Sequence, residues 1–286
     1  MRATPPIVTP LGDSLPPGLV ITVITSTLNC VGALAATARS IRSQTHPHVQ
    51  WIIADGGSTD GTVDAIRNLQ SPPVDWFSEP DTGIYDAWNK ACRRTRGRWV
   101  LFLGAGDTLA APDTLARVAA AFQSMPEDIV FAYGNVIQSS KDQVLYRYGE
   151  VTLGTWQLAR PTLPAHQGVF HRADVLGGIA PFDISYKVVA DSKLLIQAMR
   201  PEVTRYLAMD IADMQAGGVS SHPASALKVM REFLRLEADL GYRIPPLHRL
   251  SLMARNHLKV FLVRVFGSGF VERLVHAKQR WTQRRL

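Results

Sequence analysis

Short apolar runs alternate with segments of helical pattern through the first half of the chain. Five runs are predicted strands, which span residues 20–25, 49–54, 74–77, 98–103 and 128–136. The segments between them repeat apolar side chains three and four residues apart and are predicted helices, over residues 33–44, 62–69, 84–94 and 113–122. This alternation predicts βαβ units, and therefore an α/β fold with a mostly parallel sheet flanked by helices.

The alternation weakens after about residue 144, and the second half is expected to complete the sheet and to supply the acceptor side. The predicted strands there are 144–148 and 168–171, and the predicted helices are 190–199 and 224–240. From Leu247 the pattern is that of an amphipathic helix, interrupted at the Gly-Ser-Gly of residues 267–269.

The expected organisation is a leader, one large domain and a helical tail. The Pro-rich leader lacks the apolar core of a signal peptide, so we expect it to be flexible. The expected divisions are a leader over 1–18, a main domain over 19–222 with halves at 19–122 and 123–222, and a basic helical region over 223–286.

Composition and charge narrow the class of protein. The chain has 286 residues and a formal net charge of +7, with 46% hydrophobic residues, so a sizeable core is expected. The charge is uneven: residues 1–242 carry 21 Lys/Arg and 23 Asp/Glu, whereas residues 243–286 carry 10 Lys/Arg and one acid. A near-neutral body argues against nucleic-acid binding, and a basic tail favours contact with an anionic surface.

Two general features point to a cytoplasmic protein. No apolar run approaches the roughly 20 residues that a membrane-spanning helix needs. The two cysteines, Cys30 and Cys92, form no CxxC pair, so no metal or redox motif is visible. They could form one disulfide, but a reducing compartment is the simpler interpretation.

Small and acidic residues follow several predicted strands. Asp55 comes directly after the second strand and begins Asp-Gly-Gly-Ser-Thr-Asp-Gly-Thr, which leads into a helix. Ligands of open α/β sheets bind at the carboxyl ends of strands, where a carboxylate can accept hydrogen bonds from a base or ribose. An ordinary strand-turn-helix connection explains the motif equally well, and Asp60 is then expected to cap the helix.

Two further motifs end at the same predicted edge. The run from Ser78 to Lys90 places Asp81 in a turn and Asp86 four residues before Lys90, which a plain surface ion pair also explains. Gly104-Ala105-Gly106-Asp107 follows a hydrophobic strand. A single carboxylate there can hold Mg²⁺ or Mn²⁺ on a diphosphate, although a turn or helix cap is an equal alternative.

Three later features carry weaker signals. Asp191 stands at the start of a helix, as a cap or as a general base that deprotonates an acceptor hydroxyl. His166 lies in Pro-Ala-His-Gln-Gly, and a lone histidine is more often structural. The Gly-Gly-Val-Ser-Ser-His run of residues 217–222 suits a lid or a plain solvent loop.

Together these segments resemble glycosyltransferase family 2, a group of inverting enzymes with the GT-A fold. The resemblance covers roughly residues 20–220, and the run SEPDTGIYDAWNKA is similar to bacterial members that assemble capsule, exopolysaccharide or O-antigen. One such motif would be weak evidence, but five occur in order. They are Ile21–Asn29, Asp55–Thr62, Ser78–Lys90, Leu101–Asp107 and Ala190–Leu195.

The resemblance implies a GT-A-type, Rossmann-like sheet and a role for each matching position. Asp191 would be the catalytic base, and Asp107 would hold Mg²⁺ or Mn²⁺ on the donor diphosphate. His166 matches a segment on the acceptor side. The positions expected to bind the nucleotide-sugar donor are Thr25, Asn29, Asp55, Asp81, Asn89 and Gly106. The implied reaction is one in-line displacement by a hexosyltransferase-like enzyme, with inversion at the anomeric carbon.

One departure from the family pattern leaves two other classes of protein open. Ala105 stands where a D-x-D element carries its first acid, which puts metal affinity and nucleotide preference in doubt. A sugar-nucleotide-binding protein without catalysis is one alternative, but Asp191 favours an enzyme. A nucleotidyltransferase is the other, but residues 25–29 lack the Gly-rich, basic loop that would hold a triphosphate.

The basic tail suits an acceptor carried on a lipid phosphate. Apolar positions such as Leu258 and Phe261 alternate with Arg255, Lys259 and Arg264. A basic amphipathic helix can lie on an anionic membrane, here the inner face of the plasma membrane, or it can pack on the body and end in a solvated tip. Both interpretations stay open from the sequence.

Overall fold

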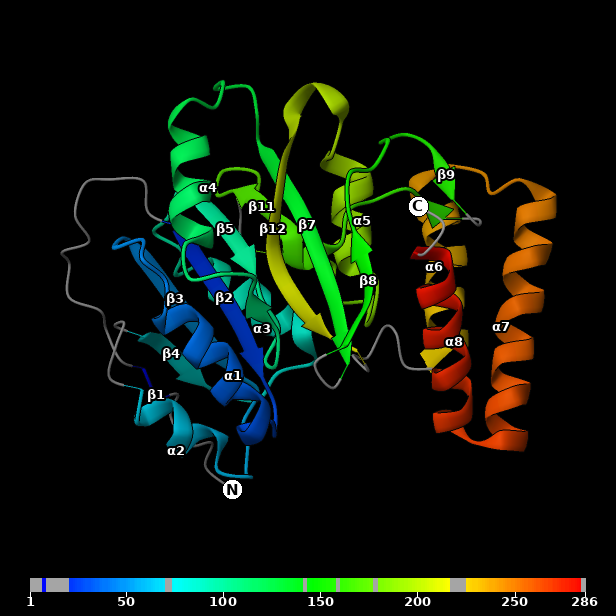
Figure 1. The fold of residues 1–286 in the computed structure, drawn as a ribbon, viewed down its shortest axis with the longest axis horizontal. Helices are drawn as coiled ribbons and strands as arrows, with labels where there is room; N and C mark the ends of the chain where they lie inside the picture. The colour runs from blue at the N-terminus through cyan, green and yellow to red at the C-terminus, as the bar shows by residue number, and fades with distance from the viewer. Residues whose placement is uncertain are drawn as a thin grey trace.

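The protein is described from a computed structural model (Figure 1), which describes residues 7–8, 21–69, 74–140, 143–157, 160–176, 180–216 and 225–283. Most of the expected leader and the expected lid at 217–222 lie outside these residues.

Elements of the first half are β1 Ile7–Val8, β2 Ile21–Thr27, α1 Val31–Arg42, β3 Val49–Asp55, α2 Thr62–Arg67, β4 Val74–Ser78, α3 Ile84–Cys92, β5 Trp99–Phe102, β6 Thr108–Leu109 and α4 Thr114–Gln123. Those of the second half are β7 Phe131–Ser140, β8 Gln143–Tyr148, β9 Trp156–Gln157, β10 Arg160–Pro161, η1 His166–Gly168, β11 Val169–Arg172, α5 Ala190–Ala198, η2 Pro201–Val203, β12 Thr204–Gln215, α6 Ala226–Leu240, α7 Pro246–Phe266 and α8 Ser268–Gln283.

A ten-stranded sheet runs through the described part of the chain in the order β1-β4-β3-β2-β5-β11-β7-β12-β6, with β8 on β7. β4, β3, β2 and β5 are parallel neighbours, which confirms the predicted mostly parallel sheet of the first half. β11 then runs antiparallel between β5 and β7. In register, Thr27 pairs with Asp55 and Asp55 with Ser78, so three strands end side by side.

Helices cover both faces of the sheet because successive strand residues point to opposite sides. α1, α2 and α4 pack on one face, where Leu34, Ile66 and Val118 join the core formed by Val23 and Trp51. α3, the start of α5 and α6 pack on the other face, where Trp88, Ala190 and Phe233 meet Ile24 and Phe102. Both faces are therefore apolar, which explains why the first strands are nearly continuous apolar runs.

The C-terminal helices follow the sheet and gather at one end of it, beyond β8 in Figure 1. α7 packs against α6 around Leu252, Met230 and Ile244. α8 contacts α7 and β8. The predicted interruption of the tail helix is confirmed at Gly267, whose φ of 81° ends α7. None of the helices in the described ranges has the length and apolarity needed to cross a membrane.

One long strand has no counterpart in the sequence-based prediction. β12 spans 12 residues, but its side chains are mostly half-buried and polar residues interrupt it, so no apolar run marks it. Its pairing with β7 is also irregular between Tyr206 and Ala212, and Ala208 has a φ of 50°. Periodicity does not detect a strand that has a bulge and neither a regular alternation nor an unbroken apolar run.

Candidate active site

Asp55 gathers the carboxyl ends of three strands around one buried carboxylate. It is the last residue of β3 and 1% exposed. Its oxygens accept hydrogen bonds from the hydroxyls of Thr27 at 2.8 Å and Ser78 at 2.7 Å. They also accept from the Gly57 and Ser58 N–H groups at 3.1 and 2.9 Å, and from the Ser58 hydroxyl.

These hydrogen bonds keep the Asp55 carboxylate charged. Burial raises the pKa of Asp55, but donation from Ser58, Ser78 and Thr27 outweighs it, so the pKa lies below its usual value. The turn after β3 is then shaped by the carboxylate, with Gly57 at a φ of 86°. Asp55 thus holds the turn after β3, and its expected contact with a nucleotide base stays a prediction.

The loop after β2 is bound to the loop after β3 by two polar residues. Asn29, at a φ of 48°, accepts from the Thr59 N–H at 2.8 Å and donates its own N–H to the Ser58 hydroxyl at 2.8 Å. Asp60 accepts from the N–H of Thr62, the first residue of α2, but the expected cap position is wrong by one residue, because Gly61 is the N-cap of that helix. It also accepts from the N–H of Val31, the first residue of α1, at 3.1 Å. One rim is therefore built from both loops.

Asp81 lies against this rim from the turn after β4. A Cβ placed on Gly56 would lie 2.5 Å from Asp81 Oδ2, so a larger residue there would displace the Asp81 carboxylate from its place against Gly56. Asp81 Oδ1 accepts from the Gly83 N–H at 2.8 Å, just before α3. The surface ion pair expected for Asp86 and Lys90 is present at 3.4 Å.

The Gly104–Asp107 turn is fixed by a hydroxyl of α1. Thr37 accepts from the Gly106 N–H at 2.9 Å and donates to the Asp107 carbonyl at 2.8 Å. Gly106 needs its positive φ of 100°, and a Cβ on Gly104 would lie 2.9 Å from Asp107 Oδ2. The small residues of the motif thus let the Asp107 carboxylate fold back over its own turn.

The Asp107 carboxylate is buried, and this burial governs its pKa. It is 8% exposed and accepts from the Gln215 N–H of β12 at 3.2 Å. Burial raises the pKa of Asp107 to about 7, and the negative charge of Asp213 adds to the rise, while the Gln167 side chain opposes it. A cation beside such a carboxylate stabilises its charged form. Carboxylate oxygens are ligands that suit Mg²⁺ or Mn²⁺.

The structure brings a second acid near the position where the D-x-D element is incomplete. Asp213 of β12 pairs in register with Thr108, next to Asp107, and accepts from the Ser139 hydroxyl at 2.9 Å. Ala105 itself offers no donor. Within the described ranges, the structure contains no cluster of three or more His, Cys, Asp or Glu side chains that could hold a metal ion.

Asp191 is joined to the start of α3 by a hydrogen bond across 106 residues of sequence. The Tyr85 hydroxyl, in the first turn of α3, donates to Asp191 Oδ1 at 3.0 Å. The Ser192 N–H donates to the same oxygen at 2.7 Å. Burial raises the pKa of Asp191, which makes the carboxylate a stronger base, although these hydrogen bonds oppose the rise.

Three other expected site residues have side chains that bond to or pack against other residues of the chain. Thr25 is fully buried, and its hydroxyl accepts from the Trp51 indole at 3.1 Å. Asn89 donates to the Phe182 carbonyl at 2.8 Å and accepts from the Phe182 N–H at 2.9 Å. The expected donor contacts of Thr25 and Asn89 therefore stay predictions, and the structure gives both side chains a structural role.

His166, the third of them, lies inside an aromatic cluster. Its ring stacks on Trp88 and Phe102, with centroids 5.2 and 5.3 Å away. Burial lowers the pKa of His166 to about 3, so the ring is neutral. Its expected place on the acceptor side stays a prediction. A structural role, which is the more common one for a lone histidine, accounts for this packing.

The two cysteines are not bonded to each other, in agreement with the simpler sequence interpretation. Sequence patterns also missed several residues that shape the site. Tyr85 lay inside a noted motif but carried no signal for a bond to Asp191. Asp213 lies in a segment without any motif, so its place beside Asp107 comes from the fold alone.

The comparisons with known proteins decide the family. The family model described as Glycosyl transferase family 2 matches residues 22–186, more than half of the chain. The chain belongs to glycosyl transferase family 2. It is a glycosyltransferase, and the resemblance found in the sequence is confirmed.

Two curated relatives agree with this assignment over almost their whole length. One is the PGL/p-HBAD biosynthesis glycosyltransferase of Mycobacterium bovis BCG (Pasteur 1173P2), 34% identical over 281 residues, which cover 93% of this chain and 98% of the relative. The protein of the same name from Mycobacterium tuberculosis H37Ra matches with the same identity and coverage.

Solved structures show the GT-A fold. The mannosyltransferase PcManGT from Pyrobaculum calidifontis, in complex with GDP-Man and Mn²⁺, superposes with a TM-score of 0.58 at 19% identity, over 90% of this chain and 79% of that one. Staphylococcus aureus TarS 1–349 with UDP gives a TM-score of 0.54 at 19% identity, over 83% and 70%.

The burial of His166 makes a testable contribution to acid sensitivity. Its folded pKa of about 3 lies below the ordinary value of 6.5, so the folded chain binds fewer protons between these values. The stability that this group contributes is present above pH 6.5 and is lost as the pH falls toward 3. We expect His166→Phe to reduce the loss of unfolding free energy between pH 7.5 and 5 by about 2 kcal/mol.

Urea unfolding at both pH values measures this difference, whatever the substitution costs at neutral pH. His248→Phe is the matched control, because His248 is exposed on α7 and should leave the pH dependence unchanged. An equal pH dependence in wild type and His166→Phe would show that burial of His166 does not contribute to acid sensitivity.

Proposed function

We propose that this glycosyltransferase moves a sugar, with inversion, from a nucleotide-sugar donor to a hydroxyl of a lipid-linked glycan in cell-surface polysaccharide synthesis. The ligands in the related structures support a nucleotide-sugar donor, since TarS has been solved with UDP and with UDP-GlcNAc, and PcManGT with GDP-Man. The site would work at the cytoplasmic face of the plasma membrane.

The hydrogen bond between Tyr85 and Asp191 is the observation that carries this proposal. Through Tyr85 and the turn at Asp81, the Asp191 carboxylate is connected to the rim at Gly56. The rim faces the donor half, where three parallel strands end at Asp55. A base held beside a binding rim, with its pKa raised by burial, suits general-base catalysis.

In the proposed reaction, Asp191 accepts the proton of the acceptor hydroxyl. The hydroxyl oxygen forms the new bond to the anomeric carbon while the bond from that carbon to the diphosphate oxygen breaks. The electrons of the broken bond leave with the nucleoside diphosphate. The Tyr85 hydroxyl and the Ser192 N–H keep the Asp191 carboxylate oriented during this transfer.

Asp107 would hold a divalent cation, with Asp213 as the nearby second acid. The residues present fit such an ion because a buried carboxylate with a raised pKa is stabilised by positive charge. When bound, Mg²⁺ or Mn²⁺ would neutralise the charge that develops on the diphosphate. The presence of Mn²⁺ in the PcManGT complex supports this proposal.

Asp191→Asn tests the base directly. The substitution keeps the size of the side chain but removes its proton affinity, so transfer should fall by about 10²–10⁴-fold. Binding of the donor should be unchanged. The donor is first chosen by thermal shift from UDP-, GDP- and dTDP-sugars with Mn²⁺ or Mg²⁺, and transfer to a membrane-lipid extract is then followed as release of nucleoside diphosphate. Normal turnover by Asp191→Asn would remove Asp191 as the base.

The lipid part of the proposal rests on the outward face of α7. Leu252 and Asn256 are buried on its inner face. An exposed apolar stripe lies opposite, at spacings of three, four or eight residues, formed by Leu247, Leu250, Leu258, Phe261 and Val265. Arg255 and Arg264 lie on either side of the stripe.

An anionic membrane surface suits this helix better than a second copy of the chain. No Asp or Glu occurs between residues 246 and 266, so a second copy of the helix would bring cations against cations. Anionic lipid headgroups would meet Arg255 and Arg264, while the apolar stripe enters the boundary of the acyl chains. Such contact would place the enzyme next to an acceptor that is carried by a lipid.

Flotation with vesicles tests the membrane proposal. The full chain should float with phosphatidylcholine vesicles that contain about a third phosphatidylglycerol, and binding should fall at high salt because screening weakens the headgroup attraction. Leu258→Gln with Phe261→Gln should reduce binding severalfold. Val144→Gln, at an exposed apolar position of β8, is the control that should bind normally. Equal flotation of all three proteins would contradict the proposal.

A further inference from the structure

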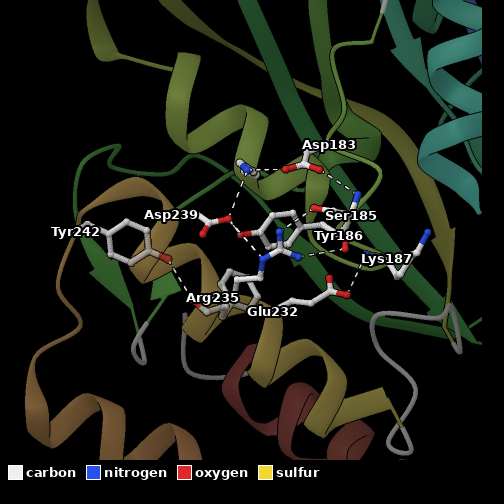
Figure 2. Close-up of polar contacts among 10 residues, drawn as sticks. Asp183, Ser185, Tyr186, Lys187, Glu232, Arg235, Asp239 and Tyr242 are labelled. Carbon is white, nitrogen blue, oxygen red and sulfur yellow. Dashed lines mark hydrogen bonds and ion pairs between the residues drawn. The ribbon is translucent and has the colours of Figure 1, made fainter.

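A single carboxylate of α6 holds the backbone just before the catalytic helix. Glu232 Oε1 accepts from the Lys187 N–H at 2.9 Å, and Oε2 accepts from the Val188 and Val189 N–H groups at 2.8 and 3.0 Å. Val189 precedes α5, and Asp191 is the second residue of that helix. Figure 2 shows Glu232 pointing from α6 toward this segment.

Two more residues on the same face of α6, one and two turns after Glu232, contact Ser185 and Tyr186, which come just before Lys187 in the chain. Arg235 donates to the Ser185 hydroxyl at 2.8 Å, and its guanidinium lies 4.2 Å from the centre of the Tyr186 ring. Asp239 accepts from the Tyr186 hydroxyl. Positions 232, 235 and 239 are three and four residues apart, so they share one face of the helix (Figure 2).

The segment that α6 holds also contacts the donor-side turn. The Lys187 ammonium donates to the Thr82 carbonyl at 3.0 Å, next to Gly83. The other end of the segment is fixed by Asn89, which makes two hydrogen bonds with the backbone of Phe182. Residues 182–189 are therefore held at both ends, and Glu232 holds the end nearest Asp191.

We propose that Glu232 is a positioning residue, whose carboxylate fixes the backbone of residues 187–189 and thereby sets the place of Asp191 relative to the donor turn at Thr82. This inference rests on the proposed role of Asp191 as the base. α6 lies beyond the residues that the family model matches, so a helix outside that region controls the alignment of the reacting groups. An alignment error of about 1 Å is enough to lower a rate about 100-fold.

Glu232→Gln is the sharpest variant because the two side chains have nearly the same size. The amide keeps one acceptor oxygen but loses the charge, and its NH₂ group cannot accept from backbone N–H groups. We expect kcat to fall at least tenfold, whereas the KM for the donor should change less than threefold. Hydrogen exchange of the amides at 187–189 should become faster, which reports the loss of the contact without any substrate.

Glu237→Gln is the matched control on the same helix. Glu237 also accepts a backbone N–H, from Ile244 at 3.0 Å, and lies 3.4 Å from Arg249, but these contacts hold the helix that follows α6. This variant should lower the melting temperature to a similar extent and leave kcat and exchange at 187–189 unchanged. Equal losses of kcat in the two variants would overturn the inference, because both would then reflect stability alone.

Combination with Asp191→Asn separates this inference from the proposed function. If Glu232 acts through Asp191, the double variant Glu232→Gln with Asp191→Asn should be no slower than Asp191→Asn alone. A further tenfold loss in the double variant, or wild-type kcat in Glu232→Gln, overturns the inference while Asp191 remains the base. Full turnover by Asp191→Asn instead overturns the proposed function.

Discussion

The buried charge of Asp55 is the constraint on which the candidate site at the ends of β2, β3 and β4 depends. An ionised carboxylate that is 1% exposed is costly unless hydrogen bonds compensate for the lost water. Here the groups that donate hydrogen bonds to Asp55 come from the end of β2, the turn after β3 and the end of β4. Each charge-assisted hydrogen bond contributes roughly 1.5–3 kcal/mol. Compensation of one charge therefore gathers three strand ends and shapes the rim that Asp81 and Asn29 complete.

Asp191, the proposed base, is held in a different way. Asp191 stands at the start of α5, after a segment that has little regular structure of its own. That segment is kept in place by side chains from two helices distant in sequence, Asn89 of α3 and Glu232 of α6. The Tyr85 hydroxyl then joins the two sides of the site. The rim around Asp55 is thus built into the parallel sheet, whereas the position of Asp191 depends on helices packed over one face of that sheet.

Much of the fold could be predicted from the sequence because its parallel strands are buried on both faces and form apolar runs. β12 could not, since it is half-exposed, polar and irregular. Among the site residues, Asp55, Asp107 and Asp191 were identifiable because each follows or begins a predicted element. The surroundings of these residues could not be predicted. The hydrogen-bond donors around Asp55 and the proximity of Asp213 to Asp107 both depend on which strands pair. Asn89 shows another limit of the motif, since the sequence does not indicate that its side chain bonds the backbone of Phe182.

In the proposed reaction, Asp191 acts as a base for one displacement at the anomeric carbon, with no covalent sugar-enzyme intermediate. The anomeric configuration of the first product tests this role most directly. Proton NMR of the glycoside, recorded from an α-linked donor before any later rearrangement, should show a β linkage. An α linkage would mean that the configuration is retained, and it would contradict the role of Asp191 as the base of a single displacement.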